Sequence, residues 1–111
     1  MADLASRHAL PDGTAPRLSG AQVDELLPCV PDWSIENGRL SRDVQVKNFK
    51  AAVSLLNAVG AIAEQENHHP DLCIHRWNHL RIEFYTHTVE GLSENDFILA
   101  AKLEQTLDTE G

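Results

Sequence analysis

Histidine is the residue type that stands out in this chain of 111 residues, because five of its six histidines lie between His68 and His87. An imidazole has an unperturbed pKa of about 6.5, so near neutral pH one histidine can donate a proton while another accepts one. His68, His69 and Pro70 stand where a predicted helix gives way to a strand, and a turn of the backbone there lets both rings line one pocket. His87 is predicted to end a later strand, at a sheet end where side chains face a cleft. The pattern suits a proton-transfer site built from His68, His69 and His87, and a solvated surface side chain or a helix C-cap is the alternative for each of them.

Two carboxylates and one aromatic residue are candidates to complete this site. Glu64 precedes His68 by four residues on the same predicted helix face, where it could orient an imidazole or form only a local ion pair. Asp96 follows Ser93 in a capping pattern, so it could tune an imidazole or only satisfy the amides of a helix start. Trp77 could be a core side chain or the wall of a pocket for a flat ligand. The residues by themselves leave these alternatives open.

A metal site is the main competing interpretation. His75 and His79 are four residues apart, and carboxylate ligands could come from Asp71, Glu83 and Asp96. This spacing puts two histidines on one face in a helix, whereas the stretch alternates like two strands around a tight turn. We therefore expect His75 and His79 to be exposed and incidental, and predict no metal ligands.

Nucleophilic catalysis and phosphate binding have less support. Cys73 lies within a strand pattern, no Gly-x-Ser-x-Gly elbow is present, and the six glycines are scattered. The two cysteines, Cys29 and Cys73, form no Cys-x-x-Cys pair, and we expect both to be buried reduced thiols.

Three helices and an N-terminal segment follow from hydrophobic period and turn signals. Residues 1–18 contain two prolines and no sustained period, which predicts a flexible N-terminal tail before one domain spanning residues 19–111. Ser19 can cap a short helix that Pro28 ends. A last helix begins at Ser93. The longest helix is predicted from about Phe49 to Glu66, with an apolar stripe of Phe49, Ala52, Val53, Leu56, Val59, Gly60 and Ala63.

Four strands are predicted in two hairpins. Asn37-Gly38 separates the alternating runs 33–36 and 39–46, and this dipeptide favours a tight hairpin because both residues tolerate positive φ. Residues 72–77 and 80–87 form a second pair joined near Asn78. The order α-β-β-α-β-β-α predicts an α+β fold in a single domain, a four-stranded antiparallel sheet with the helices packed on one face.

Composition restricts the classes of partner. The net charge of −8 disfavours a protein that coats nucleic acid or docks on an anionic membrane. No window approaches the roughly 20 apolar residues that cross a bilayer, and the N-terminus has no signal-peptide pattern, so we expect a cytoplasmic protein. With 42% hydrophobic and 23% charged residues, the chain is typical of a globular domain.

Together these residues resemble the signature of the pterin-4a-carbinolamine dehydratase family. The family pattern has a Glu, then His-His-Pro, an aromatic residue, another His, Gly-Leu-Ser and an Asp. Here it reads Glu64, His68-His69-Pro70, Trp77-Asn78, Thr86-His87, Gly91-Leu92-Ser93 and Asp96. The resemblance covers about Leu18 to Leu107. Six residues separate Pro70 from Trp77, a longer spacing that resembles bacterial and plant-type members.

The resemblance implies an enzyme that removes water from 4a-hydroxytetrahydropterin to give quinonoid dihydropterin, in the recycling of tetrahydrobiopterin. It implies no metal or organic cofactor. It assigns His68, His69 and His87 to acid–base catalysis and Glu64 to their support. The pterin would contact Pro70, Trp77, Thr86 and Asp96. It also implies a homodimer or homotetramer.

Other roles occur among proteins of this kind. Dehydratase-like proteins also assist Rubisco assembly, which would make Rubisco subunits the partners in place of a pterin. Animal members act as dimerisation cofactors for a transcription factor, a role that nothing in this sequence supports. The intact motif favours the enzyme over the assembly factor.

Overall fold

The structure is a computed structural model that describes residues 4–11 and 13–110. Its elements follow one another as α1 (Gly20–Leu26), β1 (Ser34–Glu36), β2 (Arg39–Gln45), α2 (Phe49–Glu66), β3 (Asp71–His75), β4 (His79–Phe84) and α3 (Glu94–Glu110). Short 3-10 turns occur at Leu4–Ser6, Leu27–Cys29 and His87–Val89. The predicted α+β class and the α-β-β-α-β-β-α order are confirmed. Within the described ranges, no helix is long and apolar enough to cross a membrane.

The four strands form one antiparallel sheet in the order β1-β2-β4-β3. Asn37 and Gly38 have φ angles of 52° and 75°, as the predicted hairpin turn requires. The second hairpin turns at residues 76–78, where Arg76 and Trp77 both have positive φ. This turn sets His75 directly opposite His79.

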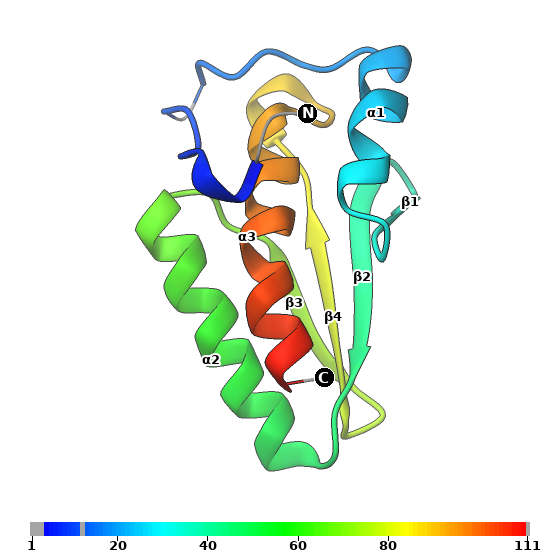
Figure 1. The fold of residues 1–111 in the computed structure, drawn as a ribbon, viewed down its shortest axis with the longest axis vertical. Coiled ribbons are helices and arrows are strands. Elements are labelled where there is room, and N and C mark those ends of the chain that lie inside the picture. The colour runs from blue at the N-terminus through cyan, green and yellow to red at the C-terminus, as the bar shows by residue number, and fades with distance from the viewer. Residues whose placement is uncertain (1–3, 12, 111) are drawn as a thin grey trace.

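The helices α2 and α3 lie side by side across one face of this sheet (Figure 1). Strand positions Leu40, Val44, Leu80, Ile82 and Phe84 are buried against the helices. The alternate strand positions form the opposite, outer face, because successive side chains of a strand point to opposite sides. Cys73 lies on that outer face and is exposed, so the expected burial of this thiol is wrong.

The buried face of α2 differs from the predicted stripe. Its buried residues are Ala52, Leu55, Val59 and Ala63, which recur every three or four residues. Phe49 and Val53 are exposed, because α2 packs with a face rotated away from both of them. An apolar strip on α2 is therefore left uncovered within one chain.

The N-terminal segment crosses the ends of α2 and α3 (Figure 1). The backbone N–H of Ala9 donates to Glu66 at 2.8 Å, and Leu10 exchanges two hydrogen bonds with the Asn95 side chain. Leu18 donates its N–H to the carbonyl of Leu92 at 2.8 Å. The flexibility predicted for residues 1–18 concerns motion rather than placement, and it stays a prediction.

The chain after β4 departs from the predicted strand. The strand was expected to continue to His87, but β4 ends at Phe84. Thr86 and Gly91 form an isolated antiparallel bridge that closes a small loop, and His87 begins the 3-10 turn within it. The bridge bends the backbone out of the sheet, so His87 lies in a loop beside the sheet end.

Candidate active site

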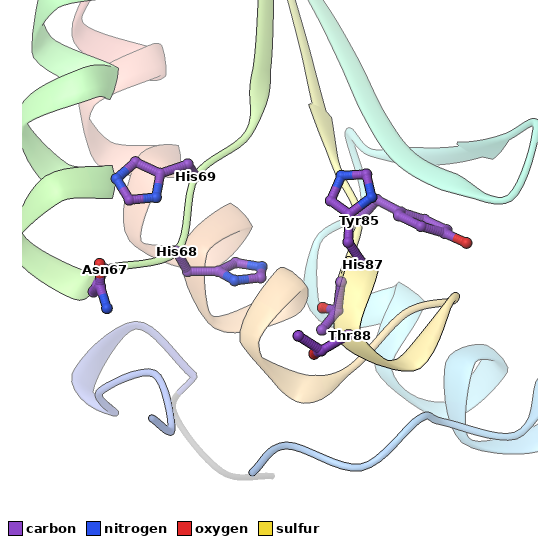
Figure 2. Close-up of a pocket in the computed structure, with 7 residues that line it drawn as sticks. Asn67, His68, His69, Tyr85, His87 and Thr88 are labelled. Atoms are coloured by element: carbon purple, nitrogen blue, oxygen red, sulfur yellow. The ribbon is translucent and has the colours of Figure 1, made fainter. Parts of the chain in front are cut away.

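Two segments far apart in the sequence meet at one end of the sheet to line a cavity of about 260 Å³. The residues that line it are Asn67, His68, His69, Tyr85, Thr86, His87 and Thr88. Figure 2 shows the first three entering from the end of α2 and Tyr85, His87 and Thr88 from the chain after β4. The structure thus brings His68, His69 and His87, the three predicted catalytic residues, to one pocket.

The exit from α2 is what turns the adjacent histidines to different partners. Asn67 has a left-handed backbone with φ of 53°, and its N–H bonds to the carbonyls of Ala63 and Glu64. This is a common helix C-terminus, because asparagine tolerates that conformation better than most residues. Pro70 then excludes further helix. The bend points His68 into the pocket, whereas His69 points back toward α2 (Figure 2).

His68 is held on two sides. Its Nε2 lies 2.6 Å from Oδ1 of Asp96, and its ring is parallel to that of Phe84, with the centroids 6.0 Å apart. The His68 side chain is 11% exposed, whereas Asp96 is fully buried. A short hydrogen bond and a stacked ring fix this imidazole in one orientation at the pocket wall.

The other oxygen of Asp96 is occupied as well. Oδ2 accepts from Thr86 Oγ1 at 2.8 Å and from the backbone N–H of Ser93 at 2.9 Å. Because Thr86 uses its single hydroxyl proton in the hydrogen bond to Asp96, the Ser93 hydroxyl is the donor in its hydrogen bond to Thr86 Oγ1, 2.8 Å away. Groups that donate to both oxygens suit an ionised carboxylate, which only accepts hydrogen bonds. Asp96 therefore accepts a hydrogen bond from His68 Nε2–H and fixes Nε2 as the ring nitrogen that carries the proton.

His69 has a looser environment. Its Nε2 lies 3.0 Å from Oε2 of Glu64, but the two side chains are 54% and 77% exposed. An exposed pair of this kind contributes little energy. Glu64 therefore contacts His69 and not His68, the histidine four residues after it on the predicted helix face.

The opposite wall is formed by His87 and its neighbours. The rings of Tyr85 and His87 meet edge to face with centroids 5.0 Å apart, and the Arg39 guanidinium lies 4.8 Å above the Tyr85 ring. His87 itself is exposed. The pocket therefore places an exposed imidazole across from the largely buried, oriented His68.

Of the four residues predicted to contact the substrate, only Thr86 lines this cavity. Trp77 is 62% exposed in the turn between β3 and β4, at the other end of the sheet, and it does not line this cavity within the chain. Pro70 is outside the lining set and shapes the α2 exit. Thr86 lines the cavity but uses its hydroxyl on Asp96, and Asp96 contacts His68 from behind. The predicted contact of these two residues with the substrate stays a prediction.

Three lining residues were not singled out from the sequence. Asn67 could have been found from the helix C-terminus rule, since it directly precedes the paired histidines. Tyr85 and Thr88 carry no local signal, because the bridge that bends this segment joins Thr86 to a residue beyond the loop.

His75 and His79 were expected to be exposed, but both are half-buried. They pair across the β3–β4 turn, and Asp43 of β2 lies between them. Partial burial raises the pKa of Asp43, but hydrogen bonds from His79 and His75 outweigh it, so the pKa lies below its usual value. The sequence argument failed because cross-strand pairing at a turn, like a helix turn, puts residues four apart on one face.

The sequence and the fold of this chain are each similar to those of known proteins. A model of the family described as "Pterin 4 alpha carbinolamine dehydratase" matches residues 16–106. A protein of Rubrobacter xylanophilus, named "Putative pterin-4-alpha-carbinolamine dehydratase", is 36% identical over 107 residues, which cover 95% of this chain and 99% of the relative. A protein of the same name from Chloroflexus aurantiacus is 42% identical over 92 residues, 83% of this chain and 98% of the relative.

Among solved structures, the chain is similar to a crystal structure of a transcriptional coactivator/pterin dehydratase from Brucella melitensis. The TM-score is 0.74 at 26% identity, covering 82% of this chain and 98% of that one.

Proposed function

The chain belongs to the pterin-4a-carbinolamine dehydratase family, and from that premise we propose that it converts a 4a-hydroxytetrahydropterin to the quinonoid dihydropterin and water. The observation that carries this proposal is the buried Asp96–His68 pair at the wall of a cavity that His87 faces from the other side. An oriented imidazole and a second imidazole across a small cavity suit a reaction that moves two protons.

The reaction needs a base and an acid. The C4a–OH bond breaks, the N5–H proton leaves, and the electrons of that N–H bond form the C4a=N5 double bond. The departing hydroxide takes a proton and leaves as water. Every atom is accounted for by the substrate and the two proton transfers, so side chains can supply all of the catalysis.

His68 is suited to remove the N5 proton. Asp96 accepts the Nε2 proton of His68, which leaves the lone pair of the neutral ring on Nδ1. When Nδ1 takes a proton, the adjacent carboxylate stabilises the imidazolium that forms. The parallel Phe84 ring prevents the imidazole from tilting away.

His87 is suited to protonate the leaving hydroxyl. His87 is exposed, so solvent can reprotonate its imidazole after each turnover. His69, held by Glu64 at the rim, would orient the flat substrate. The pterin is nearly neutral, so the net charge of −8 imposes no large penalty on its binding.

Stopped-flow absorbance tests the proposal directly. Purified protein should accelerate the dehydration of 4a-hydroxytetrahydropterin, and His68→Ala or His87→Ala should reduce the rate about a hundredfold. Glu90→Gln, a change in the same loop but outside the cavity lining, is the matched control and should keep the wild-type rate. Normal activity in both histidine variants would refute the site. An inactive wild type that binds Rubisco subunits would support assembly of Rubisco instead.

Self-association completes the proposal. Phe49 and Val53 leave an exposed apolar strip on α2, and β1 and β3 are the open edges of the sheet. Both features favour a homodimer or homotetramer. Light scattering after gel filtration should give two or four times the chain mass, and a monomer at micromolar concentration would contradict this.

A further inference from the structure

We propose that Asp43, His75 and His79 form a binding site for a divalent transition-metal ion of the zinc type, separate from the catalytic pocket. These are the described residues whose potential ligand atoms cluster, with all three atoms within 4.8 Å of one another. Two imidazoles and a carboxylate are a common protein ligand set for zinc with one position left to water.

The sheet supplies the geometry. His75 and His79 are directly opposed on β3 and β4, and their ring centroids are 5.1 Å apart. Asp43, on the neighbouring strand β2, places one carboxylate oxygen 2.8 Å from His79 Nδ1 and the other in hydrogen-bond contact with His75 Nε2. The ligands thus come from three adjacent strands of one sheet, a rigid support.

The ligand atoms are close to the arrangement that a zinc ion requires. With bonds of about 2.0–2.1 Å, two ligands of a tetrahedral ion lie about 3.3 Å apart, so small side-chain rotations bring these three atoms into place. Each ring nitrogen that faces the Asp43 carboxylate donates its proton in a hydrogen bond to it, because the carboxylate oxygens only accept. A neutral imidazole moves that proton to its other nitrogen when an ion binds, and a charged one releases it.

The local charge favours a cation. The Asp43 carboxylate lies beside both imidazoles and is an anionic oxygen ligand for a cation. Arg81 stands opposite Asp43 on β4, but its guanidinium pairs with Glu36 at 3.0 Å and with Glu83 at 3.5 Å. The neighbouring positive charge is therefore balanced by two carboxylates, and the site keeps the negative charge of Asp43.

The site and the pocket lie at opposite ends of β4. His79 begins that strand, and the cavity follows its end at Phe84, a distance of about 20 Å along the strand. Metal binding would link β2, β3 and β4 at the turn end of the sheet without touching the proposed proton-transfer residues. The two proposals can therefore fail independently.

Calorimetric titration of the chelator-treated, full-length protein with Zn²⁺ tests the site, and the visible absorption of bound Co²⁺ reports its ligand geometry. We expect one ion per chain, and a thermal midpoint about 10 °C higher at a metal concentration 100-fold above the dissociation constant. His75→Ala, His79→Ala and Asp43→Asn should each weaken binding at least tenfold. His8→Ala removes an exposed histidine outside the cluster and should bind as wild type does.

Asp43→Asn keeps the size of the side chain and its hydrogen-bonding capacity, so it separates lost ligation from lost folding. The dehydration rate of this variant should equal that of the wild type. Stoichiometric binding that survives all three changes but disappears in His68→Ala would place the ion in the catalytic pocket and overturn the proposal. The absence of Zn²⁺ binding at millimolar concentration would overturn it equally.

Discussion

Replacing Asp96 with asparagine is the change that probes the proposed catalytic arrangement most specifically. Two groups donate hydrogen bonds to Oδ2 of Asp96: the Thr86 hydroxyl at 2.8 Å and the Ser93 backbone N–H at 2.9 Å. The asparagine must therefore place its oxygen at that position. The amide nitrogen of the new side chain must then take the place of Oδ1, 2.6 Å from His68 Nε2. An amide NH₂ only donates, so His68 must accept at Nε2 and carry its proton on Nδ1. Nδ1 would still face the substrate, but it would already carry a proton and could not act as the base.

Two independent estimates give the size of the effect. Loss of a positioned general base costs about 10²- to 10⁴-fold in rate. A pair of unit charges about 4 Å apart is worth about 4 kcal/mol at an effective dielectric constant of 20. At about 1.4 kcal/mol per factor of ten, that stabilisation corresponds to about 10³-fold. We therefore expect Asp96→Asn to lower kcat about 10²- to 10³-fold with little change in KM, because in the proposed arrangement the buried Asp96 acts through His68.

Stopped-flow measurement of dehydration across a range of substrate concentrations separates kcat from KM. Glu90→Gln is the control, since it neutralises an exposed carboxylate outside the cavity lining and should keep the wild-type kcat. Circular dichroism verifies that both variants are folded. A kcat for Asp96→Asn within fivefold of wild type would refute the tautomer argument. A raised KM with unchanged kcat would show that Asp96 binds substrate directly.

Three further predictions concern stability and the N-terminal segment. Burial raises the pKa of Glu66, but hydrogen bonds from the Ala9 N–H and from His8, with Lys102 nearby, lower it below 4.5. The ionised form of Glu66 therefore stabilises the fold above about pH 4.5, and this contribution is lost as the pH falls through the lowered pKa. In urea titrations, the free energy of unfolding should fall more steeply with acid for the wild type than for Glu66→Gln. Trp77→Gly should raise the free energy of unfolding by up to about 1 kcal/mol, because a φ of 58° strains a residue with a Cβ. The dehydration rate should stay unchanged, and a large loss of rate would show that Trp77 contributes to the active site. Leu103→Ala should lower the urea-derived free energy of unfolding by about 2–5 kcal/mol, since Leu103 is fully buried, and a loss below 1 kcal/mol would contradict the packing.

Local signals predicted most of the fold. The helix Phe49–Glu66 and the Asn37-Gly38 turn were found at their observed positions, because capping by Asn48 and positive φ at the turn depend on neighbouring residues alone. The end of β4 was not predicted correctly, because the bridge between Thr86 and Gly91 depends on the conformation of the loop that it closes.

Some residues of the two candidate sites also had a local signal in the sequence, and others did not. The paired histidines at a helix exit were visible in the sequence, and a capping pattern pointed to Asp96. Nothing local indicated that Asp43 meets His75 and His79, because β2 and β4 become neighbours only when the two hairpins assemble into one sheet. Contacts between strands from different hairpins carry no signature in sequence spacing.

Imidazole signals in a carbon–proton NMR spectrum, recorded as a stable dihydropterin is added, test the central claim most directly. The six histidines report on every part of the argument at once. If the pterin occupies the proposed pocket, the signals of His68, His69 and His87 shift and saturate together, while those of His75 and His79 at the other end of the sheet stay unchanged. Shifts confined to His75 and His79, or no saturable shift in the pocket histidines, would contradict it.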